Sequence, residues 1–161
     1  MTEETTTPAA EANEQAAPTF AIQRIYLKDL SFETPMGVEA FLNPKQPQIQ
    51  QDLNIQVNQI NEDLSEVVLF LTVTAKIETR TVFLIEVKQA GIFALNGFDK
   101  SAYTHLVNTA CPQILFPYAR ETIDGVLNRG GFPPLMLPPI NFDAVFIQAV
   151  RQQQAASAQS A

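Results

Sequence analysis

Two prolines inside one apolar helical pattern constrain the fold of this chain more than any other feature. Between Lys100 and Arg129 apolar residues recur close to helical spacing, and Gly130-Gly131 marks the end of the pattern. Pro112 and Pro117 fall within it. Each proline removes an amide donor and disfavours helical backbone at the residue before it. The sequence therefore predicts one long helix that is offset or kinked near these prolines.

A second proline-rich segment follows this helix. Residues 132–139 read Phe-Pro-Pro-Leu-Met-Leu-Pro-Pro, which is apolar but unable to satisfy its backbone as a strand or helix. We expect this loop to lie over a crevice between a sheet and the last helix. Asn141 is the predicted N-cap of that helix, which has an apolar stripe at helical spacing: Phe142, Val145, Phe146, Ala149 and Val150.

Four strands are predicted before the long helix. Residues 49–59 alternate between apolar and polar side chains and indicate a half-buried strand, whereas residues 67–73 are apolar on both faces and favour a central position or a subunit contact. A third alternating run covers 81–87, and short turns between these three favour an antiparallel meander. The first strand ends at Glu33, and its broken alternation near residues 25–27 indicates a bulge.

The composition predicts one domain with flanking tails. The chain has 161 residues, of which 46% are hydrophobic, enough for one core. Residues 1–19 lack aliphatic periodicity and are expected to be a disordered arm, residues 20–151 form the domain, and residues 152–161 are expected to be a flexible tail. The three prolines between residues 34 and 47 predict an irregular loop there.

The net charge and the cysteine content indicate which partners and which cell compartment this chain favours. A net charge of -7 argues against sequence-independent binding to nucleic acid or anionic lipid, and four of these charges belong to glutamates of the arm. One cysteine cannot form an intrachain disulfide, and the N-terminus has neither the basic nor the apolar region of a secretory signal. No apolar run reaches the roughly 18 residues of a membrane span. We expect a cytoplasmic protein that does not insert into the membrane.

Residues with catalytic chemistry are sparse. His105 and Cys111 are the sole histidine and the sole cysteine, and the pattern gives neither a partner for metal binding or nucleophilic catalysis. Arg120 and Glu121 are each expected to form a structural ion pair with a strand or subunit neighbour. Gly130-Gly131 follows a helix, whereas a phosphate-binding glycine loop precedes one, so this pair is expected to cap the helix. The sequence therefore predicts no enzyme, no cofactor and no metal.

Two surface features remain open from the residues alone. Strand geometry places Asp29 and Glu33 on one face, and Leu84 and Glu86 share a face of another strand, so these residues form either a solvated sheet face or a docking surface. The many phenylalanines fill the core or line a groove. The apolar loop at residues 132–139 favours a groove for part of them.

Several segments together resemble the SecB protein-export chaperones of Gram-negative bacteria. The resemblance runs over roughly residues 20–150 and is carried by residues 20–33, 83–87, 91–93, 111–123 and 130–143. It implies an α+β subunit with a four-stranded antiparallel sheet, one long interrupted helix and a C-terminal helix, assembled as a dimer of dimers. It also implies an ATP-independent holdase that keeps unfolded presecretory proteins competent for translocation and delivers them to the SecA ATPase.

The same resemblance assigns roles to residues. It implies that Asp29, Glu33, Leu84 and Glu86 dock SecA, and that Ile85, Val87 and Gln89 lie at the tetramer interface. The implied groove for unfolded clients is lined by Phe83, Phe132, Leu135, Met136, Leu137, Phe142 and Phe146.

The chain also departs from the family pattern, and two other functions compete with the chaperone. The arm before Phe20 is longer than expected, and the tail after Arg151 carries no charge, which puts a second SecA contact by the tail in doubt. A carrier of a small hydrophobic ligand would also use an apolar pocket but needs no tetramer or acidic face. An enzyme is the least favoured alternative, because His105 and Cys111 have no predicted partners.

Overall fold

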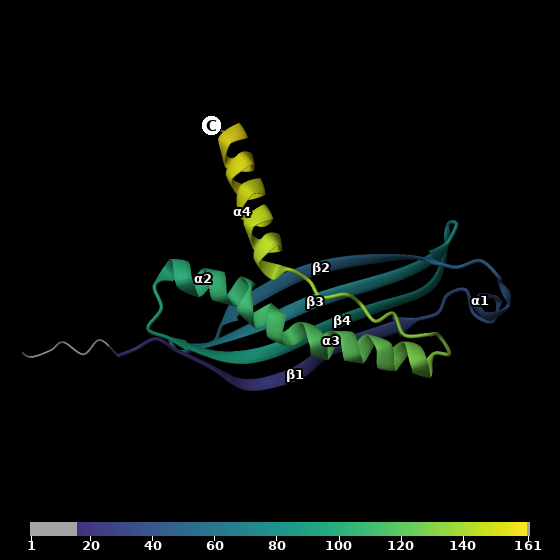
Figure 1. Cartoon of the computed structure of the whole chain (residues 1–161), viewed down its shortest axis with the longest axis horizontal. Coiled ribbons are helices and arrows are strands. Elements are labelled where there is room, and N and C mark those ends of the chain that lie inside the picture. Colours follow the sequence, from purple (N-terminus) through teal and green to yellow (C-terminus); the bar gives the residue numbers. More distant parts are fainter. Residues whose placement is uncertain (1–15, 161) are drawn as a thin grey trace, which may run out of the picture.

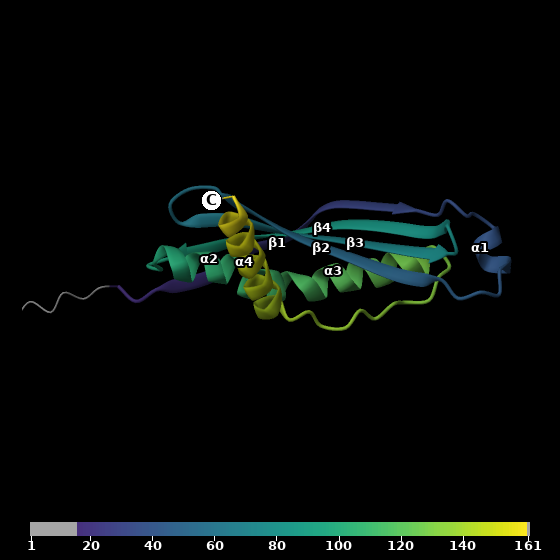
Figure 2. The ribbon, with the colours of Figure 1, turned by 90° about the horizontal axis from the view of Figure 1, so that it is seen from above.

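One antiparallel sheet forms the body of the molecule, and helices lie on one side of it (Figures 1 and 2). The computed structural model describes residues 16–160. The strands are β1 (Thr19–Glu33), β2 (Gln48–Gln59), β3 (Leu64–Ile77) and β4 (Arg80–Asn96), in the order β1-β4-β3-β2. The helices are α1 (Glu39–Leu42), α2 (Lys100–Asn108), α3 (Ala110–Arg129) and α4 (Phe142–Gln159). The predicted α+β class and four-stranded sheet are confirmed.

The central strands are the most apolar ones. β3 pairs with β2 and β4, as the predicted meander requires, and Val67, Leu69, Leu71 and Val73 are fully buried. Val68, on the opposite face of β3, is buried as well. β4 is longer than the predicted run of 81–87, because pairing with β1 on one side and β3 on the other carries it through Gly91.

The predicted irregularity in β1 is confirmed. Its register against β4 shifts between Ile22 and Arg24 and again between Leu27 and Asp29, so two bulges flank the segment 25–27. Each bulge adds one residue and thereby changes which side chains point toward the helices. Apolar side chains that do not alternate in the sequence consequently share the helix-covered face of the sheet.

The long helix is interrupted, although not where the prolines stand. α2 ends at Asn108, and Thr109 leaves helical geometry with φ -127° and ψ -71°. Pro112 lies in the first turn of α3, and its ring would clash with the carbonyl four residues earlier, at Asn108, in a continuous helix. The offset therefore falls three residues before Pro112. Pro117 is accommodated inside α3.

The core lies between the sheet and α3. Leu115, Ile123 and Leu127 of α3 are fully buried against it. Gly91 permits this approach, because a Cβ at that position would lie 2.7 Å from Cε2 of Phe93 and 3.1 Å from Cδ2 of Leu115. This glycine therefore lets helix and sheet pack closely over Phe93.

Three predictions about the flanking segments need correction or fall outside the structure. The linker 34–47 contains the short helix α1 and so is not entirely irregular. α4 continues to Gln159, so residues 152–159 are helical rather than an unstructured tail, and α4 projects from the body (Figure 1). The arm 1–19 lies almost wholly outside the described residues, within which β1 begins at Thr19. Between residues 16 and 160 no helix is long and apolar enough to cross a membrane.

Candidate binding surfaces

The loop after α3 is fixed to that helix by one carboxylate. Gly131 adopts φ +83°, which ends the helix and turns the chain back, as the Gly-Gly pair predicts. Oδ1 of Asp124 accepts hydrogen bonds from the amides of Leu135 (2.9 Å) and Met136 (3.3 Å). Asp124 thus holds the apolar loop along α3 by accepting hydrogen bonds from two backbone amides of the loop, whose prolines have none to donate.

An aromatic cluster joins this loop to the sheet and to α1. The ring of Phe132 stacks on Phe41, with 5.1 Å between centroids, and packs tilted against Phe83 at the same distance. Phe41 is 57% exposed and Leu42 is 76% exposed, so the cluster has an apolar outer surface. The sequence analysis missed both residues. Their signal was an adjacent pair of large apolar residues within a proline-rich linker.

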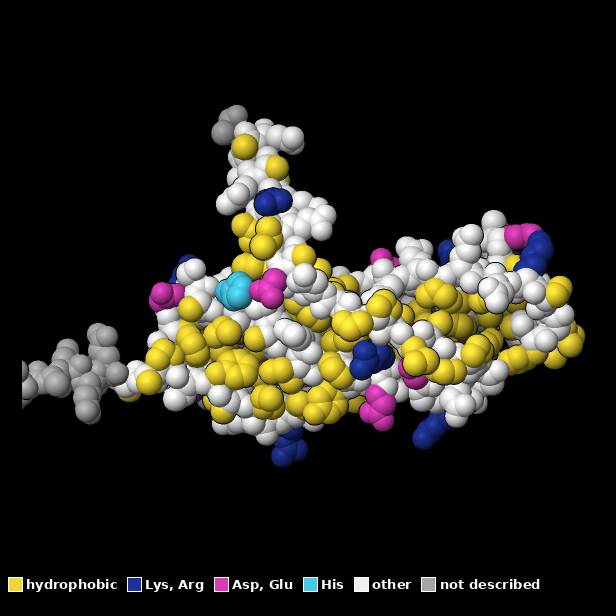
Figure 3. Space-filling model, viewed as in Figure 1, with side chains coloured by type: hydrophobic (Ala, Val, Ile, Leu, Met, Phe, Trp, Pro, Cys, Tyr) yellow, Lys and Arg dark blue, Asp and Glu magenta, His cyan; other side chains and the backbone are white. Residues whose placement is uncertain are grey.

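The predicted groove residues are only partly at the surface. Phe83, Leu137 and Phe142 are buried in the core of the subunit, which makes them structural in the single chain. Phe132, Leu135 and Phe146 are half-buried, and Met136 is 75% exposed. Hydrophobic side chains spread along this whole side of the molecule, from the α2 end to the α1 end (Figure 3).

The hollows on this side are separate. One, of about 390 Å³, lies between the loop and α3 and is lined by Arg120, Asp124 and Met136 to Pro139. Another, of about 280 Å³, lies between β2 and α4 beside Leu53, Ile55 and Phe146. The expectation that the loop covers the crevice between sheet and last helix is therefore wrong, because Asp124 keeps the loop on α3.

The opposite face of the sheet brings the predicted docking residues together. In the register of β1 with β4, Asp29 lies opposite Lys88, Ser31 opposite Glu86 and Glu33 opposite Leu84. Residues paired across an antiparallel ladder project to the same side, so Asp29, Glu33, Leu84 and Glu86 share one face. The three carboxylates are exposed and Leu84 is half-buried. The sequence analysis did not notice that Lys88 stands among them.

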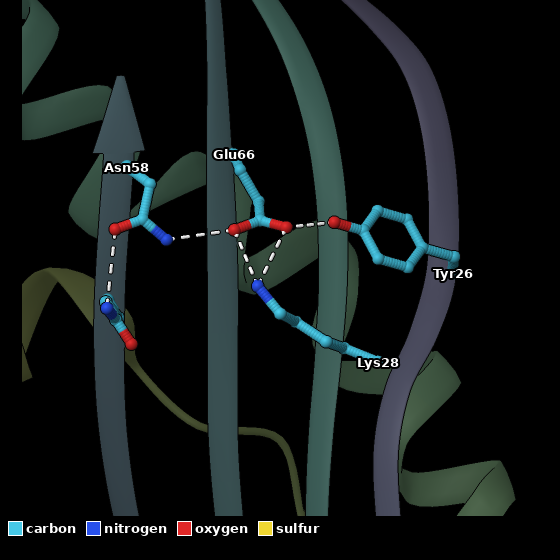
Figure 4. A network of polar contacts seen from close by, with 5 residues as sticks. Tyr26, Lys28, Asn58 and Glu66 are labelled. Carbon is cyan, nitrogen blue, oxygen red and sulfur yellow. Dashed lines mark hydrogen bonds and ion pairs between the residues drawn. The ribbon is translucent and has the colours of Figure 1, made fainter. Parts of the chain in front are cut away.

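A polar network occupies another part of this face (Figure 4). The carboxylate of Glu66 accepts hydrogen bonds from the Tyr26 hydroxyl, from Nζ of Lys28 at 2.9 and 3.1 Å, and from Nδ2 of Asn58 at 2.9 Å. Tyr26 is in register with Ala90, and Ala90 with Val68. Val68 and Ala90 are both buried, although they lie on the side of the sheet opposite the core with α3.

The network shifts the pKa values of its members in opposite directions. Burial alone would raise the pKa of Glu66, but the hydrogen bonds from Tyr26, Lys28 and Asn58 and the charge of Lys28 lower it to about 2. Burial, the hydrogen bond to Glu66 and the charge of Glu66 raise the pKa of Tyr26 to about 12. Glu66 is thus ionised but already fully engaged.

The residues assigned to a tetramer interface are core residues of one chain. Ile85 and Val87 are at most 1% exposed and Gln89 is 4% exposed, with Nε2 of Gln89 donating to the carbonyl oxygen of Tyr26 at 3.1 Å. A second subunit has almost no surface to touch there. The assignment as direct interface residues therefore needs correction: they support the sheet face beneath the helices.

The residues considered for catalysis have structural surroundings. Cys111 is fully buried, and burial raises the pKa of its thiol to about 12, so it behaves as a small hydrophobic residue. His105 does have a partner, Oδ1 of Asp143 at 3.1 Å, and its ring lies edge-on to Phe146. The guanidinium of Arg120 lies over the ring of Phe116, 5.7 Å from its centroid, and an ion pair of Arg120 with a neighbouring subunit stays a prediction. No group of three metal-ligating side chains occurs within residues 16–160.

The fold has a counterpart among solved structures. A SecB-like chaperone of Mycobacterium tuberculosis, solved in complex with an antitoxin peptide, superposes with a TM-score of 0.63, over 75% of this chain and 90% of that one, at 19% sequence identity. The superposition places this subunit in the class of SecB-like folds.

Sequence comparison identifies the family within that class. The family described as preprotein translocase subunit SecB matches residues 13–153. The protein-export protein SecB of Cellvibrio japonicus is 71% identical over 143 residues, which is 88% of this chain and 86% of the relative. That of Saccharophagus degradans is 52% identical over 155 residues, which is 94% and 92% of the two chains. This chain belongs to the SecB family, which is a family of chaperones and not a class of enzymes.

Proposed function

We propose that this protein is an ATP-independent holdase of the cytoplasm that binds unfolded presecretory proteins, keeps them competent for translocation and delivers them to SecA. Family membership supports the general function. The observation that carries the proposed mechanism is the presence of two different surfaces on opposite sides of one sheet. One is apolar and the other is charged, so a client and a delivery partner would not compete for the same residues.

The client surface is proposed to be the apolar side around α1 and the loop. Leu42 and Met136 are each at least 75% exposed, and the Phe41–Phe132–Phe83 cluster joins α1, which carries Leu42, to the loop that carries Met136. Flexible and aromatic side chains accept many sequences because they require no fixed hydrogen-bond pattern. Several such patches on one assembly would bind a long unfolded chain by avidity, whereas a folded protein offers little to bind.

The delivery surface is proposed to be the charged face of β1 and β4. Asp29, Glu33 and Glu86 are exposed carboxylates around the half-buried Leu84. This arrangement suits a partner with basic groups and a small apolar contact, as the resemblance implies for SecA. No cofactor is needed for either binding event.

The working assembly is proposed to be a dimer of dimers. Sheets would pair edge to edge, and the long helices would pack between dimers. Ile85, Val87 and Gln89 would then influence assembly indirectly, by supporting the sheet against which α3 packs.

The decisive test is a refolding assay without nucleotide. The wild-type protein should slow refolding of a denatured presecretory protein and form a complex of one tetramer per client. The double variant Leu42→Ser, Met136→Ser should bind the client about tenfold more weakly, since losing two exposed apolar contacts removes roughly 1.4 kcal/mol.

A matched control separates this effect from a general loss of hydrophobic surface. Ile60 is 52% exposed in the turn after β2, so Ile60→Ser should retain normal client affinity. Equal weakening by both variants would contradict the placement of the client surface. No effect of the wild-type protein on refolding, with a small apolar molecule retained instead, would favour the ligand carrier.

A further inference from the structure

A lysine stands at the centre of the face proposed to dock SecA. One cross-strand row of this face consists of Asn54 of β2, Phe70 of β3, Lys88 of β4 and Asp29 of β1, which are successive partners in the sheet register. Glu86 lies two residues from Lys88 on the same strand and therefore on the same side of the sheet. The face is consequently mixed in charge rather than acidic throughout.

Lys88 has no protein acceptor for its ammonium group among the described residues. Its Nζ lies 5.2 Å from the centroid of the Phe70 ring, a cation–π contact that uses none of its three N–H donors. The lysine ion pairs within residues 16–160 are Lys28–Glu66 and Lys45–Glu78. Phe70 thus supports the stem and head of the half-buried Lys88, and its N–H donors have no acceptor among the described side chains.

One of the other lysines near this region, Lys28, is neutralised. Lys28 donates to both oxygens of Glu66, as Figure 4 shows. An approaching partner would therefore find Lys28 paired and Lys88 free. Compared with Lys28, Lys88 is the cation whose hydration a docked partner would have to replace.

We propose that Lys88 determines the specificity of the docking surface by requiring a hydrogen-bond acceptor, a carboxylate or a backbone carbonyl, at the centre of an otherwise basic partner segment. This inference rests on the proposed function, namely that this face docks SecA. Basic groups of the segment lie over Asp29 and Glu86, and the acceptor lies over Nζ of Lys88. A uniformly basic segment without the acceptor is rejected, because it would leave the ammonium desolvated and next to like charge.

The test measures the binding of purified SecA to the full chain by titration calorimetry. Lys88→Met keeps the apolar stem over Phe70 but removes the donors, and we expect about tenfold weaker binding. Lys88→Arg keeps charge and donors and should stay within about threefold of the wild type. Lys100→Met removes an exposed lysine from the start of α2, on the helix side, and serves as the matched control with unchanged affinity.

A parallel variant separates failure of this inference from failure of the proposed function. Asp29→Asn should also weaken SecA binding if the face docks SecA at all. Weakening by Asp29→Asn together with unchanged or tighter binding by Lys88→Met overturns the role of Lys88 alone. Unchanged binding by both variants overturns the docking face itself. Each variant must still slow client refolding normally, which shows that it is folded.

Discussion

At the scale of single residues, the ionised carboxylate of Glu66 contributes to the stability of the fold. Its pKa of about 2 lies below the ordinary value of 4.5, so the folded protein stabilises the ionised carboxylate more than the unfolded chain does. A group with a lowered pKa contributes stability above its unfolded pKa and loses that contribution as the pH falls through the folded value. The relevant window is therefore between about pH 4.5 and pH 2.

This gives a prediction for Glu66→Gln. The variant should be less stable at pH 7 by about 1–2 kcal/mol, because it keeps the shape but loses the charge that Lys28 and Tyr26 bind. The difference from the wild type should shrink as the pH falls from 5 to 3. Urea unfolding of both proteins at pH 7, 5, 4 and 3 measures this difference in unfolding free energy.

The control for that experiment removes a carboxylate of the same sheet face that makes no such network. Asp52 is exposed and pairs in register with Thr72, so Asp52→Asn should change the unfolding free energy little. A difference between Glu66→Gln and wild type that stays constant from pH 7 to pH 3 would show that Glu66 does not act through its charge.

At the scale of elements, the loop 132–141 depends on Asp124 of α3. Two amides of the loop, those of Leu135 and Met136, share one carboxylate oxygen. Asp124→Ala should release this part of the loop, and we expect faster hydrogen exchange at residues 135 and 136 with little change in the sheet. Hydrogen exchange read by mass spectrometry on loop peptides measures this.

The matched variant at this site is Asp124→Asn, which keeps an acceptor oxygen and should preserve most of the protection. Protection that survives in Asp124→Ala would mean that packing of Leu137, which is buried, holds the loop without the carboxylate.

The elements were predictable from the sequence where one local pattern determined them. Alternation identified β2, and a run that is apolar on both faces identified β3. Asn141 indeed accepts a hydrogen bond from the amide of Ala144 as the N-cap of α4. Helix α1 was not predictable, because its four residues are too few to show a period. The helix break was placed at the prolines, whereas the steric demand of Pro112 acts one turn earlier, at Thr109.

The surfaces were less predictable than the elements. The shared face of Asp29, Glu33, Leu84 and Glu86 follows from strand periodicity, but only the register between β1 and β4 reveals Lys88 opposite Asp29. The groove assignment failed for Phe83 and Phe142 because a phenylalanine in a helix or strand looks the same in sequence whether it faces the core or a ligand. The Glu66 network joins three strands at long sequence separation, which no local pattern encodes.

At the scale of the whole molecule, one flank of the sheet is incomplete in a single chain. β1 is an edge strand, and several of its apolar side chains on the helix side remain exposed. They are Phe20 (37% exposed), Ile22 (46%), Leu27 (45%) and Leu30 (38%). An exposed apolar edge strand favours association. We expect a second copy to cover this flank in the proposed dimer of dimers.

Disrupting that flank should therefore reduce the assembly. Leu27→Glu, Leu30→Glu places two charges on the flank of β1, and we expect light scattering after size exclusion to give a species smaller than the tetramer at micromolar concentration. Leu42→Glu adds a charge at an even more exposed leucine, but on α1, and should leave the tetramer intact. Far-UV circular dichroism and thermal unfolding of each variant show whether it is folded. A folded β1 variant that remains tetrameric, or a wild-type protein that is monomeric, would mean that this flank is not where subunits meet.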